Sequence, residues 1–565
     1  MASTLRRTAY HTARRLSIPS LKLAIRNSST LEKNILTSPF KDIPKVNYTI
    51  PEFVWQNLDR WPDKTATVCA VTGHGYTYAQ THRMSVAFAA SLRTKLKLRN
   101  DDKVAIILPN LPEYPVALFG TLEAGCIATL MNPAYTAHEL QHQLSKIDCQ
   151  AIIASKLSYA NIKGALDSLK KDIPIILVDN ENLPEGTIKF AEFAEDFNLC
   201  TDCLKSVKRE PNDVAILPFS SGTTGFPKGV VLNHRSVVAM NQQISDPDII
   251  VIEETSESHQ AVLPAVLPFF HIFGFNALMV NQMYLGVKLV TMPYFKPDLF
   301  LQSLVKHQAN VLFLVPPMVV FLGKHPAVQA AHLQSVYGVI SGAAPVSETD
   351  AAAVLKKNPK INFRQGYGLT ETNGAATIGF NVDDNHAAVG HVLPSSQIKI
   401  ADIQTHEALP AGEEGEIWYR GPNVMQGYYD DEEATAQVFR DGWYKTGDIG
   451  KYDDSRYLYV TDRIKELIKV KGFQVAPAEV EAIIRTNPKV ADCAVIGVPD
   501  PVSGEVPKAF IVPQPNQTIS PEELKEYVNS KLVSFKHLKE VQSIEAIPKN
   551  AAGKILRKDL KAKYC

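Results

Sequence analysis

The feature that most constrains the fold of this 565-residue chain is an alternation of two sequence patterns between about Thr65 and Val320. Short runs that are apolar on both faces, such as KVAIILPN, CQAIIAS and NVLFLVPP, alternate with longer amphipathic stretches. Strands of this kind are typical of parallel sheets that carry helices on both faces. The pattern therefore predicts an α/β fold with parallel sheets.

The pattern changes twice further along the chain. After Gly390, short strands alternate with turns, as in GEIWYRGPNVMQGYY and SRYLYVTDR, which predicts a small β-barrel-like subdomain. Beyond Asp462 we expect a helix from about Pro477, strands at CAVIGVPD and KAFIVP, and a helix at SPEELKEYVNSKL. A prior of roughly 150 residues per domain also predicts several units. We expect a large N-terminal domain over 31–462, built of α/β subdomains, and a small α+β C-terminal domain over 463–565.

The first thirty residues have a composition of their own. They are rich in Ser and Thr, and no acidic residue precedes Glu32. The basic residues in this stretch are Arg6, Arg7, Arg14, Arg15, Lys22 and Arg26. This composition predicts a mitochondrial transit peptide over 1–30, and a basic tail on a cytoplasmic protein is the alternative. The chain ends in KAKYC and carries no Ser-Lys-Leu peroxisomal signal.

Composition and hydropathy exclude several classes of function. Hydrophobic residues make up 45% of the chain and the formal net charge is zero, so neither disorder nor a broad basic surface for nucleic acid is expected. The seven cysteines are scattered, and Cys200 and Cys203 have no second pair with which to hold zinc. The apolar stretch 261–280 contains Pro264 and Pro268, so we expect a buried strand, turn and helix there and no transmembrane helix.

A phosphate-binding loop is the strongest local signal of chemistry. The stretch FSSGTTGFPKGVVLNH, from Phe219 to His234, combines three glycines, four hydroxyl residues and one lysine. Glycines let backbone amides approach an anion, and hydroxyls and a lysine can bind phosphate oxygens. The candidate residues are Ser220, Ser221, Gly222, Thr223, Thr224 and Lys228. Because Gly229 follows the lysine, the spacing does not fit a P-loop NTPase. A glycine-rich surface turn is the alternative.

Five further motifs follow this loop in order. They are QGYGLTET (365–372), GEIWYRGP (415–422), WYKTGD (443–448), DRIKELIKVKGFQVAPAEVE (462–481) and PKNAAGKILR (548–557). With the loop, they closely resemble the acyl-adenylate-forming superfamily, and within it the group that contains 4-coumarate:CoA ligases, fatty acyl-CoA synthetases and beetle luciferases. The resemblance extends over nearly all of the chain after about residue 45. It implies an acid–thiol ligase that uses ATP, Mg²⁺ and CoA, and that forms an acyl-AMP before the thioester.

The resemblance also implies positions for the nucleotide and the metal. Gln365, Gly366 and Tyr367 would line the adenine site, Thr370 would contact the α-phosphate, and Glu371 would hold Mg²⁺. Asp448 would accept hydrogen bonds from the ribose hydroxyls, with Arg463 beside it. The opening loop would hold the β- and γ-phosphates, which leave as pyrophosphate.

The two half-reactions would use different faces of a mobile C-terminal domain. Lys554 would stabilise the transition state at the α-phosphate during the first step. Asp462 and Arg463 mark the hinge about which the KVKGFQ face would replace the Lys554 face. On that second face the resemblance places the catalytic or nucleotide-binding residues Lys469, Lys465 and Gln474, and the CoA-binding residues Lys471 and Gly472.

The acyl pocket carries the prediction about substrate. His271 falls where the family has a histidine that faces the acyl carboxylate. Where 4-coumarate ligases have a tyrosine and a serine, this chain has Phe273 and Ala277, and both changes remove a hydroxyl. Small residues at Gly342, Ala343 and Ala344 would complete the wall. The sequence therefore predicts a medium- or long-chain fatty acid, with a cinnamic or other aryl acid as the alternative.

Other functions remain open at this stage. A luciferase-like monooxygenase would form the same acyl-AMP and then oxidise it. A module that loads a carrier protein would be expected to carry an attached carrier motif, and a non-catalytic relative would be expected to have lost Lys554 or the loop. We expect a small-molecule acid, ATP and CoA as the partners, and no nucleic acid.

Overall fold

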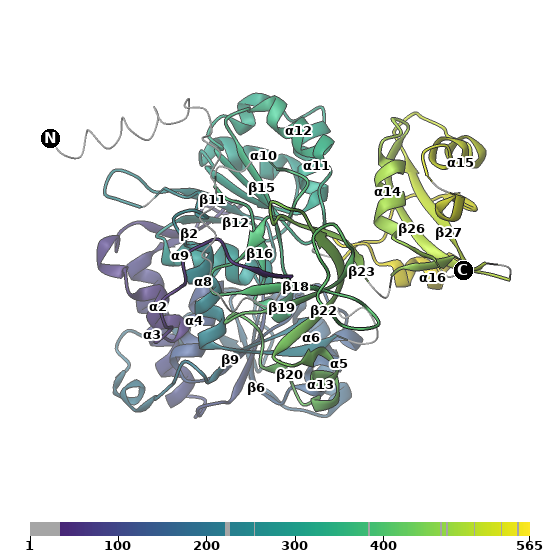
Figure 1. Ribbon diagram of the computed structural model, residues 1–565. Helices are drawn as coiled ribbons and strands as arrows, with labels where there is room; N and C mark the ends of the chain where they lie inside the picture. The colour runs from purple at the N-terminus through teal and green to yellow at the C-terminus, as the bar shows by residue number, and fades with distance from the viewer. Residues whose placement is uncertain are drawn as a thin grey trace.

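The computed structural model describes residues 34–220, 227–253, 255–381, 385–463, 466–470, 473–501, 503–532, 534–550 and 553–564. Figure 1 shows a large body and a smaller lobe at the right of the view, which carries α14, α15, α16, β26 and β27. The chain therefore has a large N-terminal part and a separate C-terminal domain, as the sequence predicts.

The largest sheet has eight strands, in the order β20-β10-β9-β5-β4-β6-β7-β8. Every pair from β9 to β8 is parallel, whereas β10 pairs antiparallel with β9 and with β20. The strands are β4 (Lys103–Ile107), β5 (Ile127–Leu130), β6 (Cys149–Ala154), β7 (Ile175–Leu177), β8 (Ile188–Lys189), β9 (Val214–Ser220), β10 (Lys228–Asn233) and β20 (Gly427–Tyr428).

Helices cover both faces of this sheet, as the apolar runs predict. In β4, Val104 and Ile106 pack into one core, which also includes residues of α3 (Tyr78–Thr94) and α4 (Glu113–Glu123). The alternate residues Ala105 and Ile107 pack into a second core with α5 (Ala137–Lys146) and α6 (Lys156–Leu169). Successive side chains of a strand point to opposite faces, which explains why the whole run is apolar.

Two smaller sheets complete the α/β region. One has four strands in the order β11-β12-β2-β3, and the other has five in the order β13-β14-β15-β16-β17. The strands of the first are β2 (Thr65–Cys69), β3 (Gly75–Thr77), β11 (Val262–Ala265) and β12 (Lys288–Thr291). Those of the second are β13 (Val311–Leu314), β14 (Gly338–Ser341), β15 (Asn362–Tyr367), β16 (Thr377–Ile378) and β17 (His391–Val392).

The remaining helices of this region are mostly short. They are α2 (Ile50–Trp55), α7 (Ala191–Ala194), α8 (His234–Ile244), α9 (Asn281–Tyr284), α10 (Pro297–Lys306), α11 (Pro316–Lys324) and α12 (Glu348–Lys357). Single 3₁₀ turns occur at η2 (Leu58–Arg60), η3 (Asp202–Ser206), η5 (Ala330–Leu333) and η6 (Thr370–Thr372).

The apolar stretch 261–280 forms β11, a turn, and a buried π-helix, η4 (Phe273–Val280). This order of elements is the one that the sequence predicts. In the part of the chain that the structure describes, no helix is both long enough and apolar enough to cross a bilayer.

A six-stranded antiparallel sheet follows the α/β region. Its main path runs β1-β18-β19-β22-β21, and β23 pairs with β22. The strands are β1 (Ile35–Thr37), β18 (Gln397–Ala401), β19 (Gly415–Arg420), β21 (Phe439–Arg440), β22 (Trp443–Tyr452) and β23 (Leu458–Arg463). Helix α13 (Glu432–Val438) lies between β20 and β21 in the chain. This is the sheet that the sequence predicts as a β-barrel-like subdomain, and its pairing forms an open path.

The C-terminal domain has a sheet of its own. Its strands are β24 (Ile468–Val470), β25 (Phe473–Val475), β26 (Val490–Asp500), β27 (Gly504–Pro513) and β28 (Glu540–Ser543). Its helices are α14 (Pro477–Arg485), α15 (Pro521–Asn529), η7 (Ser534–Lys536) and α16 (Arg557–Tyr564). Residues of α14 and α15 pack into one core of this domain and Leu560 of α16 into another, so the sheet is covered on both faces.

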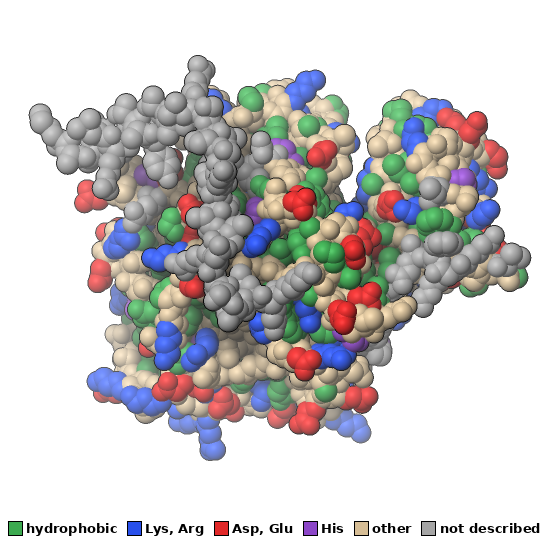
Figure 2. Space-filling model, viewed as in Figure 1, with side chains coloured by type: hydrophobic (Ala, Val, Ile, Leu, Met, Phe, Trp, Pro, Cys, Tyr) green, Lys and Arg blue, Asp and Glu red, His purple; other side chains and the backbone are tan. Residues whose placement is uncertain are grey.

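The surface agrees with the zero net charge. On the face shown in Figure 2, acidic and basic side chains are interspersed over both the large body and the C-terminal lobe. The six cysteines within the described residues are all free.

Candidate active site

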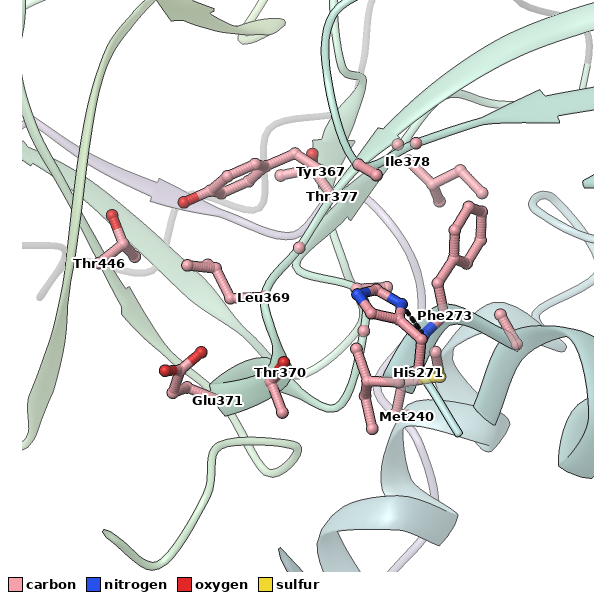
Figure 3. Close-up of a pocket in the computed structure, with 18 of the residues that line it drawn as sticks. Met240, His271, Phe273, Tyr367, Leu369, Thr370, Glu371, Thr377, Ile378 and Thr446 are labelled. Atoms are coloured by element: carbon pink, nitrogen blue, oxygen red, sulfur yellow. Dashed lines mark hydrogen bonds between the residues drawn. The ribbon is translucent and has the colours of Figure 1, made fainter. Parts of the chain in front are cut away.

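A cavity of about 500 Å³ lies where the sheets of the large domain meet the C-terminal domain. Its wall comes from β9, β10, α8, η4, β14, β15 and β22, and from the loop that carries Asn550 and Lys554. Figure 3 shows side chains from several of these elements converging on one space. Most candidate residues of the described chain border this cavity.

The phosphate-loop residues that the structure describes lie at one side of the cavity. Ser220 ends β9, Lys228 begins β10, and the two residues are paired across the hairpin. Lys228 Nζ lies 3.4 Å from Asp431 Oδ2 and 5.1 Å from the ring centroid of Tyr428. Ser221, Gly222, Thr223 and Thr224 lie outside the described residues.

Glu371 is a buried carboxylate beside this hairpin. It lies with Thr370 on the short turn η6, and both residues line the cavity (Figure 3). Tyr428 Oη donates to Glu371 Oε1 at 3.0 Å. Burial raises the pKa of Glu371, because the charged form loses its hydration. A cation bound at Glu371 would offset that loss, so the position suits a metal ion.

A metal at this site would need ligands that the protein does not supply. Among the described residues, no three His, Cys, Asp or Glu side chains gather to hold a metal. Mg²⁺ commonly takes one or two carboxylates and completes its shell with water and substrate phosphates. Glu371 therefore fits a metal that arrives with a nucleotide.

Strand β15 places only some of its motif at the cavity. Arg364, Gly366 and Tyr367 line the cavity, but Gln365 does not. Gln365 Oε1 accepts from the Val346 N–H at 2.7 Å, and its Nε2 donates to the carbonyls of Val346 and His386. In this structure the Gln365 side chain thus bonds to backbone groups of Val346 and His386, and a place for Gln365 at the adenine site stays a prediction. Side chains alternate along a strand, so Gln365 points away from the face that carries Arg364 and Gly366.

Asp448 lies behind the cavity wall, and its predicted bond to the ribose hydroxyls stays a prediction. Tyr367 Oη donates to Asp448 Oδ2 at 2.7 Å, and Arg463 Nε lies 2.9 Å from Asp448 Oδ1. Arg463 is thus beside Asp448, as expected, and lines the cavity. Asp448 is only 3% exposed and does not border the cavity. In this structure its carboxylate fixes Tyr367 and Arg463, which border the cavity in its place.

His271 lies just before η4 and points into the cavity (Figure 3). The Phe273 N–H donates to His271 Nδ1 at 3.3 Å, so the ring proton lies on Nε2. Burial lowers the pKa of His271 to about 4. The ring is therefore neutral near pH 7, with an N–H at Nε2 that can donate to a ligand oxygen.

An apolar wall follows His271. Phe273 and Ala277 on η4 line the cavity, together with Gly342 and Ala343 after β14. A Cβ at Gly342 would lie 3.1 Å from Phe273 Cε1, so the missing side chain leaves room for the ring. Ala344 does not border the cavity, so its place in the acyl pocket stays a prediction. Ala343 is exposed and Ala344 is half-buried.

Lys554 reaches the cavity from the C-terminal domain. A tight turn presents it: the Asn550 N–H donates to the Lys554 carbonyl, and the Lys554 N–H donates to Asn550 Oδ1. Gly553 has φ of 76°, a left-handed conformation that favours glycine. Burial, and then the nearby Arg463, lower the pKa of Lys554 to about 8.

The structure describes only part of the segment predicted for the second step. The backbone of Lys469 in β24 is paired with that of Gln474 in β25. Lys465, Lys471 and Gly472 lie outside the described residues. Among the candidate residues of the C-terminal domain whose side chains the structure describes, Lys554 lies at the cavity.

Sequence reasoning missed several residues at the cavity. Tyr428 donates to Glu371 and Asp431 lies beside Lys228, and no motif identified either residue from the sequence. Gln282 also lines the cavity. Together with Asn281 it follows an apolar run and belongs to no motif, so only the fold places this polar side chain at the cavity.

The chain is similar to known proteins in sequence and in structure. A family model described as "AMP-binding enzyme" matches residues 54–429, and one described as "AMP-binding enzyme C-terminal domain" matches 479–554. The chain is 36% identical over 541 residues to 4-coumarate–CoA ligase 1 of Arabidopsis thaliana, covering 94% of this chain and 95% of the relative. It is 37% identical over 527 residues to 4-coumarate–CoA ligase 2 of Petroselinum crispum, covering 92% and 95%.

Among solved structures, ATP-bound MatB from Rhodopseudomonas palustris matches with a TM-score of 0.80 at 26% identity, covering 92% of this chain and 99% of that one. The apo form of the same protein matches with a TM-score of 0.69. The overall arrangement of this chain is therefore closer to the ATP-bound form than to the apo form.

Proposed function

Because the chain belongs to the AMP-binding enzyme family of the acyl-adenylate-forming superfamily, we propose that its cavity joins a carboxylic acid to CoA with cleavage of ATP to AMP and pyrophosphate. The family makes it an AMP-forming acid–thiol ligase. The observation that carries the proposal is the meeting of Lys228, Glu371, His271 and Lys554 around one cavity.

In the first step, a carboxylate oxygen of the acid bonds to the α-phosphorus of ATP, and the bond from that phosphorus to the bridging oxygen breaks. Pyrophosphate leaves, and the product is an acyl-AMP. Lys554 and the Nε2–H of His271 would stabilise the negative charge that crowds around the phosphorus. Lys228 and Ser220 would bind the departing phosphates at the hairpin.

Glu371 is the residue that would hold Mg²⁺. The ion, when bound, would neutralise charge on the phosphates. The hydrogen bond from Tyr428 orients the carboxylate. Burial disfavours the charged form of Glu371, and a nearby cation would stabilise it. Mg²⁺ and ATP would therefore bind together.

In the second step, the CoA sulfur bonds to the acyl carbon, the bond from that carbon to the AMP oxygen breaks, and the thiol proton is released. An acyl phosphate anhydride needs no enzyme nucleophile, so the step uses no catalytic cysteine or serine. The resemblance assigns this step to a second orientation of the C-terminal domain, with Lys471 and Gly472 beside the thiol channel.

For the acid, we propose an aryl acid of the cinnamate type. The fatty acid predicted from Phe273 and Ala277 has less support, since the curated relatives are 4-coumarate–CoA ligases. The wall formed by Phe273, Ala277 and Gly342 suits a flat ring, because Phe273 lines the cavity and aromatic pairs favour offset or edge contacts.

The test uses protein that lacks residues 1–30, incubated with ATP, Mg²⁺, CoA and a panel of cinnamic, benzoic and fatty acids. Mass spectrometry of the products would detect each thioester. We expect cinnamoyl-type thioesters and a requirement for ATP. Fatty acyl thioesters alone would overturn the choice of acid, and the absence of every thioester would overturn the ligase assignment.

We also propose mitochondrial import through residues 1–30, on the strength of their basic, hydroxyl-rich composition. A fluorescent protein fused after residue 30 should enter mitochondria. A fusion in which the arginines of this segment are replaced by glutamine should remain in the cytosol, and equal distributions of the two fusions would contradict the proposal.

A further inference from the structure

A row of buried asparagine side chains lies behind the cavity wall, between the helix that follows His271 and the turn η6. The row consists of Asn241 in α8, Asn276 in η4, Asn373 at the end of η6, and Asn423 after β19. All four residues are fully buried, and none of them borders the cavity. The row therefore connects two elements of the site without contacting a ligand itself.

The hydrogen bonds fix the direction in which each amide of the row points. Asn241 Nδ2 donates to the Val237 carbonyl at 2.8 Å and to Asn276 Oδ1 at 2.6 Å. Because the Val237 partner is a carbonyl, the donating atom of Asn241 must be its nitrogen, and the accepting atom of Asn276 must be its oxygen. Asn276 Nδ2 then faces the Asn373 carbonyl, to which it donates at 3.0 Å.

The turn η6 is held from a second side by Asn423. Asn423 Nδ2 donates to the carbonyls of Thr372 and Ala375, and Asn373 Nδ2 donates to the Asn423 carbonyl at 2.8 Å. The last carbonyls of a helical turn have no partner within the turn, so side chains have to satisfy them when they are buried. The bond from Asn276 joins this turn to η4.

The backbone of this turn is in a conformation that needs support. Asn373 has a φ of 57°, in the left-handed region, which a residue other than glycine adopts at a cost in free energy. Gly374 follows, and a Cβ added there would lie 3.4 Å from the Ile272 carbonyl. Gly374 and Ile272 both line the cavity. The bond from Asn276 thus holds the end of η6 where its backbone packs against the start of η4.

Of the two elements, η6 is the one that is free to shift. The π-helix η4 is anchored, because its buried apolar residues belong to the main core of the large domain. In contrast, η6 is a single turn of three residues. The Asn373 N–H donates to the Thr370 carbonyl at 3.1 Å, so Thr370, Glu371 and the Asn373 carbonyl belong to one unit. A displacement of that unit would move the side chains that line the nucleotide end of the cavity.

We propose that Asn276 is a positioning residue, whose amide holds η6 against η4 and thereby sets the places of Thr370 and Glu371 for the nucleotide. This inference rests on the proposed function and adds to its nucleotide site a residue of the helix that lines the acid site. Asn276 acts through Asn373 and touches no substrate. Loss of its donor should therefore weaken the binding of the nucleotide more than that of the acid.

The kinetic test replaces Asn276 with leucine, which has a similar size and no hydrogen-bonding groups. ATP–pyrophosphate exchange with a cinnamic acid gives KM for ATP and KM for the acid. In Asn276→Leu we expect KM for ATP to rise by about tenfold, because the Asn373 carbonyl loses its bond, and KM for the acid to stay within about twofold. An unchanged KM for ATP, or an equal rise of both KM values, would overturn the inference.

Asn358→Leu is the matched control. Asn358 follows α12, its Nδ2 donates to the carbonyls of Leu333 and Val336, and its Oδ1 accepts from the Lys360 N–H. It is buried and does not border the cavity. This variant should lose stability in thermal unfolding and keep both KM values. A rise of KM for ATP equal to that in Asn276→Leu would overturn the inference, because any lost buried amide would then suffice.

Asn276→Ser keeps the inference testable if the leucine variant does not fold. A serine hydroxyl can bond to the preceding turn of its own helix, so it needs no other partner, and it is too short to reach the Asn373 carbonyl. We expect the same selective rise of KM for ATP. A KM for ATP equal to that of the natural protein would overturn the inference.

A binding measurement separates this inference from the proposed function. The non-hydrolysable analogue α,β-methylene-ATP, with Mg²⁺ and no acid, would be titrated calorimetrically into the natural protein and Asn276→Leu. We expect an affinity about tenfold lower in the variant. If the natural protein forms no thioester with any acid, the proposed function fails, and this difference in affinity still decides the role of Asn276. Equal affinities, or no binding by the natural protein, would overturn the inference.

Discussion

At the scale of single residues, burial adjusts two groups for opposite tasks. His271 loses its affinity for a second proton and stays a neutral donor, whereas Lys554 keeps its proton with a pKa of about 8. In both cases the charged form is disfavoured because the cavity removes its hydration. The two side chains would thus reach an incoming phosphate as one neutral and one cationic donor.

The pH dependence of adenylation should report Lys554. The cation is present below a pKa of about 8 and is lost as the pH rises through that value. We expect kcat/KM for pyrophosphate formation, which reports the free enzyme, to fall above about pH 8. Lys554→Arg should abolish this fall, because arginine stays charged. A fall that persists in Lys554→Arg would assign the titration to another group.

His271 should contribute no titration near neutrality. Because its pKa is lowered to about 4, the rate of adenylation should not change through protonation of His271 between pH 5 and 7.5. Replacing His271 with alanine should slow adenylation by about 100-fold, through loss of the Nε2–H donor. An inflection near pH 6.5 that disappears in the alanine variant would contradict the neutral ring.

At the scale of elements, the sequence predicts where the strands lie in the chain, but it predicts poorly which of their side chains point to the cavity. The apolar run of β4 predicts burial on both faces, and two cores confirm it. The motif around β15 predicts a nucleotide site, but the alternation along the strand turns Gln365 away from the cavity. A motif identifies which segment is functional, and only the strand's register and twist decide which side chain faces the ligand.

The segment after β14 allows a direct test of the acyl wall. Gly342→Leu should press on Phe273 and reduce kcat/KM for cinnamic acids by roughly tenfold or more, because overpacking has costs of this order. Ala344→Leu, two residues away and outside the cavity wall, should leave kcat/KM within about twofold. Steady-state kinetics on the two variants checks this, and equal losses would contradict the wall as described.

At the scale of the whole molecule, the position of the C-terminal domain decides which half-reaction the cavity can perform. Lys554 and Asn550 of the C-terminal domain border the cavity. Strand β23 ends at Arg463 and the next sheet begins at Ile468, so the connection between the domains is short. The sequence predicts both domains, but it does not predict their relative orientation, because that depends on contacts such as Gly553 against Pro317.

The measurement that tests the central claim most directly separates the two half-reactions in Lys554→Ala and Gly472→Trp. ATP–pyrophosphate exchange reports the first step, and thioester formation from synthetic acyl-AMP and CoA reports the second. We predict that Lys554→Ala loses exchange by about 100-fold or more and keeps thioester formation, and that Gly472→Trp does the reverse. If Lys554→Ala lost both activities equally, the claim that Lys554 acts only in the formation of the adenylate would be contradicted.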